Sequence, residues 1–255
     1  MVQKVKTGIP GLDKILYGGV PQGKIVLLSG GAGTGKSILS LEYIYRGAKE
    51  FKEPGVYIST EQSEEEFLTQ AKEFGWDVEP LLKKNLIKII KLDVAKGGNY
   101  LKVIKDAVNK VKAKRLVIDS LTTLTEFLTP IEIKKSKGTE LIDLIENIFP
   151  VPVTENLIVK SILLRFLADL RKLNCTTLVT SELPEQSNFL SRDTVSEFLC
   201  DGVIVLYFVG IGGEETNHLQ IRKMRYSRFI RGYFPLKFTD KGLEVTEESI
   251  SILMK

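Results

Sequence analysis

The stretch KIVLLSGGAGTGKS, residues 24–37, joins an apolar run to a glycine-rich turn and then to a helical pattern. Its last eight residues have the spacing GxxxxGK[ST], in which glycines let backbone N–H groups converge on phosphate oxygens at a helix start. We expect Lys36 to reach the β- and γ-phosphates of a nucleotide and the Ser37 hydroxyl to ligate magnesium. The alternative, a glycine-rich turn with a solvent lysine, is disfavoured by the flanking strand and helix.

This phosphate-binding loop is called the P-loop below. The predicted nucleotide-binding residues are Gly30, Gly31, Ala32, Gly33, Thr34, Gly35, Lys36 and Ser37.

Short apolar runs bounded by turn residues recur along the chain, with helical patterns between them. The predicted strands are 24–30, 55–60, 86–92, 115–120, 176–183, 201–209 and 218–226, with a hairpin at 235–245. The predicted helices are 37–51, 63–75, 99–113 and 155–173. This alternation is typical of an α/β protein with a mainly parallel sheet flanked by helices. The last strands predict antiparallel hairpins on the C-terminal side.

The 255 residues show no linker and no internal repeat, so we expect a single domain over residues 1–255. Residues 121–154 break the alternation and contain three prolines around a candidate helix at 140–149. We interpret that segment as an insertion or mobile loop.

The composition is that of an ordinary globular protein, with 43% apolar and 27% charged residues. A net charge of +4 does not by itself indicate a nucleic-acid partner. Cys175 and Cys200 lack metal-ligand spacing and are expected to be buried thiols, and the single histidine, His218, is expected to open a strand. No signal peptide and no apolar run of the roughly 20 residues that a membrane helix needs is found, so we expect a cytoplasmic protein.

An acid is expected at the end of a buried strand, because the magnesium ion needs a carboxylate in its outer shell and the P-loop supplies none. The apolar run RLVIDS, residues 115–120, supplies Asp119. An acid in that position can also be a plain helix cap. Beside a P-loop, we predict that Asp119 serves the metal together with Ser37.

The acidic stretch STEQSEEE, residues 59–66, divides into two parts. Residues 63–66 have the pattern of a capping box, so helix initiation explains their charges. Glu61 follows directly after the predicted strand 55–60, at the edge of the sheet where ligands of parallel sheets bind. We predict that Glu61 orients or deprotonates the water that attacks a γ-phosphate; the alternative is a cap or a solvated acid.

Taken together, the motifs resemble those of the RecA superfamily and, within it, of KaiC-like ATPases. The motifs that match in order are TGIPGLDKILYGGVPQG (7–23), the P-loop, Glu61, VIDS (117–120), TSELP (180–184), DGVIVL (201–206), KMR (223–225) and PLKFTDKGLEV (235–245). The resemblance spans nearly the whole chain apart from about 121–154. It implies a RecA-like P-loop core that binds ATP or ADP with magnesium, hydrolyses ATP, and assembles into a ring, usually a hexamer.

One position departs from the KaiC-like pattern. In those proteins the position of Glu61 is followed by a second glutamate, and both serve as catalytic carboxylates. This chain has Gln62 there, which implies slow or differently tuned hydrolysis.

Lys223 and Arg225 are two residues apart on a predicted strand and are expected to share a face. They could be a solvated edge of the sheet. The resemblance instead implies that both reach into the ATP site of the neighbouring subunit, as an arginine finger does. Tyr226 stands where a glycine usually follows KMR, and the aromatic and basic residues of 226–233 would also suit nucleic acid.

Three functions follow. The first is a magnesium-dependent ATPase that hydrolyses ATP at the subunit interfaces of a ring, with a regulatory role. The second is a recombinase-like DNA-binding ATPase, which is disfavoured because residues 184–199 contain one arginine against three acids. The third is a nucleotide-gated module that hydrolyses little and acts on an unknown protein partner.

Overall fold

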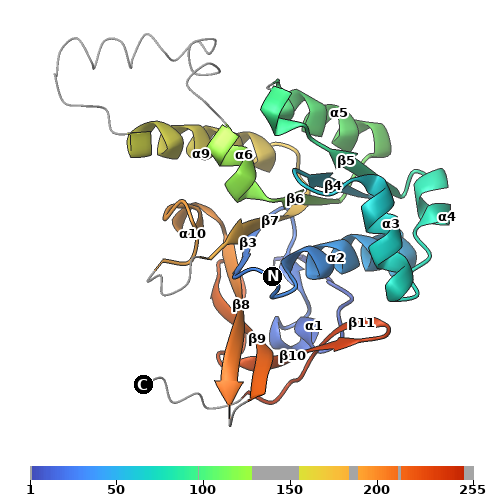
Figure 1. The fold of residues 1–255 in the computed structure, drawn as a ribbon, viewed down its shortest axis with the longest axis vertical. Coiled ribbons are helices and arrows are strands. Elements are labelled where there is room, and N and C mark those ends of the chain that lie inside the picture. Colours follow the sequence, from blue (N-terminus) through green and yellow to red (C-terminus); the bar gives the residue numbers. More distant parts are fainter. Residues whose placement is uncertain (1, 97, 128–154, 184–188, 212–213, 250–255) are drawn as a thin grey trace.

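The structure is a computed structural model that describes residues 2–96, 98–127, 155–183, 189–211 and 214–249 (Figure 1). Its strands are β1 (Lys4–Val5), β2 (Val20–Pro21), β3 (Ile25–Gly30), β4 (Gly55–Ser59), β5 (Ile87–Lys91), β6 (Arg115–Asp119), β7 (Thr176–Glu182), β8 (Gly202–Ile211), β9 (Glu214–Met224), β10 (Phe234–Thr239) and β11 (Gly242–Val245). The described helices are α1 (Leu12–Ile15), α2 (Lys36–Glu50), α3 (Glu64–Glu73), α4 (Glu79–Lys83), α5 (Tyr100–Val111), α6 (Leu121–Phe127), α9 (Glu155–Arg171) and α10 (Ser196–Leu199), with a 3₁₀ turn at Val94–Lys96.

The main sheet has the order β11-β10-β9-β8-β3-β7-β6-β4-β5 in the described residues. The strands from β8 to β5 in this order are mutually parallel, whereas β9, β10 and β11 are added antiparallel. All six residues of β3 are buried, as expected for the centre of a parallel sheet with helices on both faces. The predicted α/β class with a parallel core and C-terminal hairpins is confirmed.

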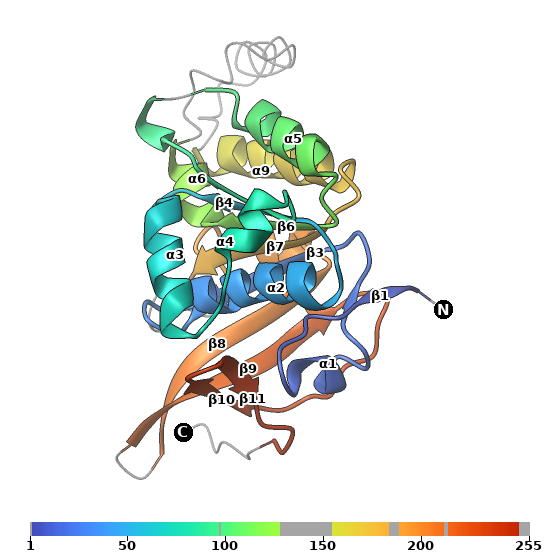
Figure 2. The same ribbon diagram turned by 90° about the vertical axis from the view of Figure 1, so that its right-hand side faces the viewer.

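Helices cover both faces of the parallel strands. Helices α5, α6 and α9 lie on one side, and α2, α3 and α4 lie on the other (Figure 2). Two apolar clusters fill the spaces between these layers and the sheet. The antiparallel strands β9, β10 and β11 extend away from the parallel core, and the β10–β11 hairpin passes beside α2. The sheet therefore wraps around the helix that starts at the P-loop.

The structure corrects several details of the predicted elements. The β8–β9 ladder continues to the pair Ile211 and Glu214, so the strands are longer than predicted and the connection is shorter. His218 lies inside β9 rather than at its start and is buried. Residues 121–127 form helix α6, whereas residues 128–154, with the candidate helix 140–149, lie outside the described residues. The single domain and the insertion therefore stay predictions.

Both cysteines are buried free thiols, as predicted. Burial raises the pKa of Cys175 to about 11 and that of Cys200 to about 12. In the part of the chain that the structure describes, no helix is long and apolar enough to cross a membrane.

Candidate functional site

The P-loop connects the end of β3 to the first residue of α2. Gly33 and Gly35 have φ angles of 75° and 95°, a region that side chains with a Cβ atom rarely adopt. This conformation turns the chain tightly enough for α2 to begin at Lys36, with its N-terminus facing the loop. A helix start with converging N–H groups is suited to bind an anion. The structure thus gives the predicted motif its expected strand, turn and helix.

The Lys36 side chain folds back over the loop. Its ammonium group donates to the carbonyl oxygens of Gly30 at 2.9 Å and Gly31 at 2.8 Å. Burial lowers the pKa of Lys36, and three nearby carboxylates, of Asp119, Glu182 and Glu61, act in the opposite direction. The P-loop lysine is therefore surrounded by acids that come from the ends of three different strands.

Asp119 ends β6 and is held between two neighbouring strands. Its Oδ2 atom accepts a hydrogen bond of 2.5 Å from Tyr57 on β4, and its Oδ1 atom accepts one of 2.5 Å from Thr180 on β7. Burial and the Asp119 charge raise the pKa of Tyr57, so the phenol keeps its proton and acts as the donor. Tyr57 and Thr180 therefore hold one oxygen each of the predicted magnesium residue Asp119.

The donor set fits a magnesium ion that is shared with phosphates. Magnesium usually keeps several waters and binds through few protein oxygens plus substrate phosphates. Ser37 and Asp119 supply a hydroxyl and a carboxylate of this kind beside the P-loop. The described residues contain no group of three or more His, Cys, Asp or Glu side chains that could hold a metal by themselves.

Glu61 lies just past the end of β4 with an exposed side chain. The Ser59 hydroxyl accepts hydrogen bonds from the backbone N–H groups of Glu61 at 3.2 Å and Gln62 at 2.8 Å, which fixes the turn after the strand. Thr123 on α6 donates to Oε1 of Glu61 at 3.3 Å. The buried Oε1 atom of Gln62 has no hydrogen-bond partner in the described residues.

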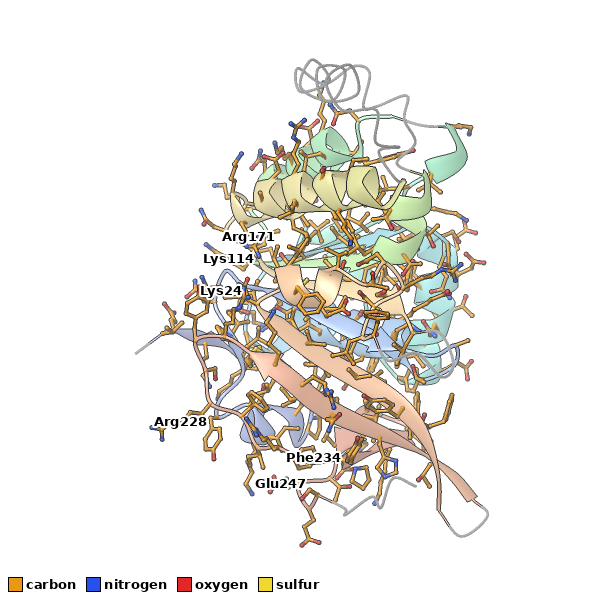
Figure 3. The ribbon with its side chains drawn as sticks, turned by 90° about the vertical axis from the view of Figure 1, so that its left-hand side faces the viewer. Lys24, Lys114, Arg171, Arg228, Phe234 and Glu247 are labelled. Carbon is orange, nitrogen blue, oxygen red and sulfur yellow. The ribbon has the colours of Figure 1, made fainter. Side chains whose placement is uncertain are left out.

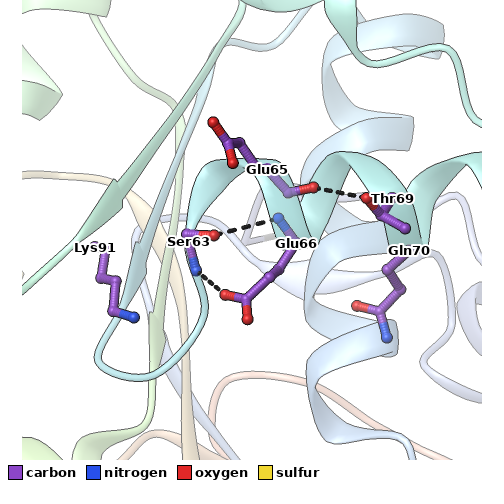
Figure 4. Close-up of a pocket in the computed structure, with 6 residues that line it drawn as sticks. All are labelled: Ser63, Glu65, Glu66, Thr69, Gln70 and Lys91. Carbon is purple, nitrogen blue, oxygen red and sulfur yellow. Dashed lines mark hydrogen bonds between the residues drawn. The ribbon is translucent and has the colours of Figure 1, made fainter.

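The remaining acids of the stretch 59–66 start helix α3, as predicted. The Ser63 side chain accepts from the Glu66 N–H at 3.3 Å, and the Glu66 carboxylate accepts from the Ser63 N–H at 2.6 Å (Figure 4). These hydrogen bonds lower the pKa of Glu66. This capping box lines a pocket with Gln70 and Lys91, and Lys36 is not among the residues that line it. The acids in it are accounted for by helix initiation.

One further acid at the site, Glu182, was not predicted as a site residue. Glu182 ends β7 next to the P-loop strand, and its side chain forms an ion pair of 3.1 Å with Arg192. The backbone N–H of Glu182 donates to Thr122 on α6. The sequence did contain a signal, since Glu182 follows a buried run just as Asp119 does.

Lys223 and Arg225 lie at the opposite edge of the sheet from the P-loop of the same chain. Lys223 pairs with Val203 near the start of β8, which lies beside the start of β3, whereas the P-loop follows the end of β3. The Lys223 ammonium donates to the carbonyl oxygens of Glu197, Phe198 and Cys200 around α10. Arg225 donates to the Phe198 carbonyl at 3.4 Å. The structure therefore does not bring these two cations to their own P-loop.

Other cations lie along this amino-terminal edge of the parallel strands. Lys24 precedes β3, Lys114 precedes β6, and Arg171 ends α9 just before β7 (Figure 3). In contrast, Glu61, Asp119 and Glu182 lie at the carboxyl edge. Both edges also carry charges of the other sign, since Asp201 lies 3.8 Å from Arg171 and 4.0 Å from Arg225 at the amino-terminal edge, and Lys36 lies among the acids at the carboxyl edge.

Tyr226, which replaces the usual glycine, has a φ angle of 65°. A left-handed conformation costs a residue with a Cβ atom about 1–2 kcal/mol. The Tyr226 ring is 60% exposed and lies under the Lys24 ammonium, 4.3 Å from the ring centroid. The backbone therefore keeps the shape that a glycine would favour. Two aromatic residues that follow make contacts within the chain. Phe229 packs against the core, and the Tyr233 ring contacts the Tyr207 ring.

Comparison with known proteins decides the family. A family model described as "ATPase: KaiC" matches residues 5–137 and 131–250. The chain belongs to the KaiC family of ATPases. A UPF0273 protein from Thermotoga maritima is 32% identical over 96% of this chain and 96% of its own length. The crystal structure of a KaiC-like protein from Pyrococcus horikoshii has a TM-score of 0.78 and 33% identity, and covers 96% of this chain and 99% of that protein.

The circadian clock oscillator protein KaiC of Prochlorococcus marinus is 31% identical over 96% of this chain. The chain spans only 45% of the length of that relative. Membership of the KaiC family supports a RecA-type P-loop fold, ATP binding and ATPase activity.

Proposed function

We propose that this KaiC-family chain is a magnesium-dependent ATPase that works at the subunit interfaces of a ring, usually a hexamer in the resembling family, and that its nucleotide state has a regulatory role. The observation that carries the proposal is the convergence of Lys36, Asp119 and Glu61 at one edge of the sheet. A P-loop supplies phosphate binding, a buried strand-end carboxylate supplies metal binding, and an exposed carboxylate supplies a base.

In this proposal the N–H groups of residues 30–37 bind the phosphates of ATP, and Lys36 leaves the carbonyls of Gly30 and Gly31 to bind the β- and γ-phosphates. Ser37 and Asp119 would hold magnesium, which neutralises charge that develops on the phosphate oxygens. Tyr57 and Thr180 position Asp119 by occupying one oxygen each.

Glu61 accepts the proton of the water that attacks the γ-phosphate, and Thr123 orients the Glu61 carboxylate. Lys223 and Arg225 act on the ATP bound to a neighbouring subunit. Their place at the edge opposite to their own P-loop supports a role in trans over a role in cis. Each site is then completed by two chains.

The test is steady-state release of phosphate from ATP. Lys36→Ala should abolish release, and Glu61→Gln should lower it by about 10²-fold or more, as expected for loss of a general base. Glu65→Gln is the matched control, because Glu65 is an exposed acid in the first turn of α3. Wild-type turnover in both Lys36→Ala and Glu61→Gln would contradict the assigned mechanism. Molar mass from light scattering, with and without ATP and magnesium, tests the ring.

A recombinase-like function has less support. Asp193 and Glu197, two acids of the segment 184–199, accept hydrogen bonds within that segment, and Arg192 pairs with Glu182. Residues 184–188 lie outside the described residues. Stimulation of ATPase activity by single-stranded DNA, weakening with salt, would favour this alternative. ATP that stays intact after prolonged incubation would favour the nucleotide-gated module with a protein partner. We expect the cytoplasm as the compartment in each case.

A further inference from the structure

Two exposed tyrosines have a backbone conformation that favours glycine. Tyr17 follows helix α1 with a φ angle of 52°, and Tyr226 follows β9 with one of 65°. Their side chains are 59% and 60% exposed. A left-handed residue at a turn is usually glycine or a short polar residue such as asparagine, so the turns themselves do not account for a tyrosine. Strained residues that the local structure does not require gather at functional sites, so the two rings indicate a surface with a function.

The two tyrosines belong to one continuous surface. It consists of residues 2–6, 14–24 and 226–233 and is called the tyrosine surface below. The Lys4 ammonium donates to the Tyr17 carbonyl oxygen at 2.8 Å, and the N–H of Ile230 donates to the last residue of α1 at 2.9 Å. The Lys24 ammonium lies 4.3 Å from the centroid of the Tyr226 ring. These contacts bring together three segments that are far apart in the sequence.

The tyrosine surface is basic. Its three segments contain no acid and six cations, which are Lys4, Lys6, Lys14, Lys24, Arg228 and Arg231. Glu247, from outside these segments, forms an ion pair with Lys14. Lys24 and Arg228 lie on the same side of the molecule (Figure 3). Since the whole chain has a net charge of +4, all the other residues together carry −2. The tyrosine surface therefore accounts for the excess positive charge of the chain.

A ligand for this surface needs repeated negative charges and flat apolar faces. Single-stranded nucleic acid has both, because its phosphates contact lysine and arginine while its bases stack on aromatic side chains. An acidic protein segment would match the cations but would leave the two strained rings unexplained. We propose that the tyrosine surface binds single-stranded nucleic acid, with bases on Tyr17 and Tyr226 and phosphates on Lys24 and Arg228. This surface is distinct from the segment 184–199, and the proposal does not depend on ATP hydrolysis.

Fluorescence anisotropy with labelled oligothymidylate and oligouridylate of about 20 nucleotides tests the rings. Tyr17→Gly and Tyr226→Gly each remove one ring and suit the left-handed backbone, so the midpoint of urea unfolding should change little. We expect each variant to bind about tenfold more weakly than the wild type. Tyr226→Phe keeps the ring and should bind like the wild type. Asn85→Gly is the matched control, because Asn85 is exposed with a φ angle of 54° but has no ring, and its affinity should be that of the wild type.

The salt dependence of binding tests the cations. Lys24→Gln and Arg228→Gln should each reduce the slope of log affinity against log salt concentration by about 0.7, the value for one phosphate contact with a single strand. Lys84→Gln is the charge control, because Lys84 is an exposed lysine just before β5, the strand at the far end of the sheet. That variant should leave the slope unchanged.

Unlabelled polyglutamate and inorganic polyphosphate are the competitors, since both are polyanions without bases. Each should displace the oligonucleotides less well than unlabelled oligothymidylate does. Equal displacement by polyphosphate would mean that the surface binds any polyanion, and equal displacement by polyglutamate would favour an acidic protein. Both results would overturn the proposal.

Unchanged affinity in both tyrosine-to-glycine variants would place the nucleic acid elsewhere on the chain, against the proposal. A wild-type protein that binds neither oligonucleotide at about 50 mM salt would also refute it. Tyr226 directly follows Arg225, so light scattering of the same variants checks the assembly. Loss of self-association with unchanged oligonucleotide affinity would assign the rings to a second copy of the chain and overturn the proposal.

Discussion

The phenol of Tyr57 and the carboxylate of Asp119 are joined by a hydrogen bond of 2.5 Å within the sheet, between the adjacent strands β4 and β6. Tyr57 is fully buried and Asp119 is 9% exposed. A buried carboxylate is tolerated when its oxygens accept strong hydrogen bonds, and Thr180 supplies the second donor. The position of Asp119 beside the P-loop therefore depends on Tyr57 and Thr180, two residues that lie outside the P-loop motif.

Tyr57→Phe removes the donor and leaves the ring in place. We expect the free energy of unfolding to fall by about 1–3 kcal/mol, because one oxygen of a buried carboxylate loses its partner. We also expect a higher magnesium concentration for half-maximal phosphate release, because Asp119 is held less firmly. Urea denaturation and a magnesium titration measure the two effects. Tyr45→Phe is the control, since its hydroxyl accepts a hydrogen bond from the part-exposed Lys49 side chain rather than bonding to the site. An unchanged magnesium concentration for half-maximal phosphate release would show that Tyr57 does not contribute to the proposed metal site.

Gln62→Glu restores the second carboxylate that KaiC-like proteins carry. We expect phosphate release to rise by roughly tenfold, a small part of what a general base contributes. We also expect the protein to lose about 1–3 kcal/mol of stability, because the buried Oε1 atom would become part of an unpaired charge. Gln70→Glu is a matched control, since its Oε1 atom is also buried without a partner in the described residues. That control should lose stability without gaining turnover. Equal turnover in Gln62→Glu and the wild type would show that the missing acid does not limit hydrolysis.

Mixing two inactive variants tests the role of Arg225 in trans. Glu61→Gln has an impaired site and intact cations, whereas Arg225→Ala has an intact site and lacks one cation. If subunits exchange freely, the mixture should recover roughly a quarter of wild-type turnover, because half of the sites are intact and half of the neighbours supply Arg225. Arg222→Ala, an exposed cation on the same strand, should keep wild-type turnover. A mixture that assembles but stays inactive would argue for action within one chain.

Glu42 on α2 predicts a pH dependence of stability. It is fully buried and accepts hydrogen bonds from Arg46 at 2.6 Å and from the Leu243 N–H at 2.8 Å. Burial nevertheless raises its pKa above the ordinary value of 4.5. The folded protein therefore holds this proton more tightly than the unfolded chain does. Its contribution to stability should fall as pH rises from about 4.5 through the raised pKa, and should level off above it.

Urea unfolding of the wild type and of Glu42→Gln, from about pH 4 to pH 8, measures this contribution. The stability of the wild type minus that of the variant should decrease with pH in the window above 4.5. Glu50→Gln removes the exposed partner of Arg46 but keeps Glu42, so it should follow the wild-type slope. Parallel curves for the wild type and Glu42→Gln would contradict the prediction.

The sequence predicted the strands and helices whose apolar residues follow a local run or a regular spacing. The apolar run of β3 and the helical spacing of α2 are local patterns, and the structure confirms both. Elements such as β1, α4 and α10 are two to five residues long and were not predicted. Such short pieces depend on tertiary contacts, because one helical turn is unstable alone. Helix α6 was missed because LTTLTEF is rich in threonine, which has a low helix propensity.

The candidate site was predicted where its residues lie in the P-loop or at the end of a buried strand. Glu61 and Asp119 follow buried strands, and the structure places both near Lys36. Tyr57 and Thr180 lie inside strands, where tyrosine and threonine are ordinary β formers. Only the order β4-β6-β7, which no local pattern specifies, places them on either side of Asp119. The distance of Lys223 from its own P-loop likewise follows from the antiparallel pairing of β8 with β9.

The placement of acids at one edge of the sheet and of Lys223 and Arg225 at the other has a geometric consequence for assembly. In the proposed action of Lys223 and Arg225 on a neighbouring subunit, the contact would be heterologous, because the edge with these cations would meet the P-loop edge of the next copy. A two-fold symmetric pair joins identical surfaces and cannot fill both edges of both partners. Successive head-to-tail contacts either close into a ring or continue as an open filament. The rotation between neighbours, rather than the strength of the contact, would then decide which of the two assemblies forms.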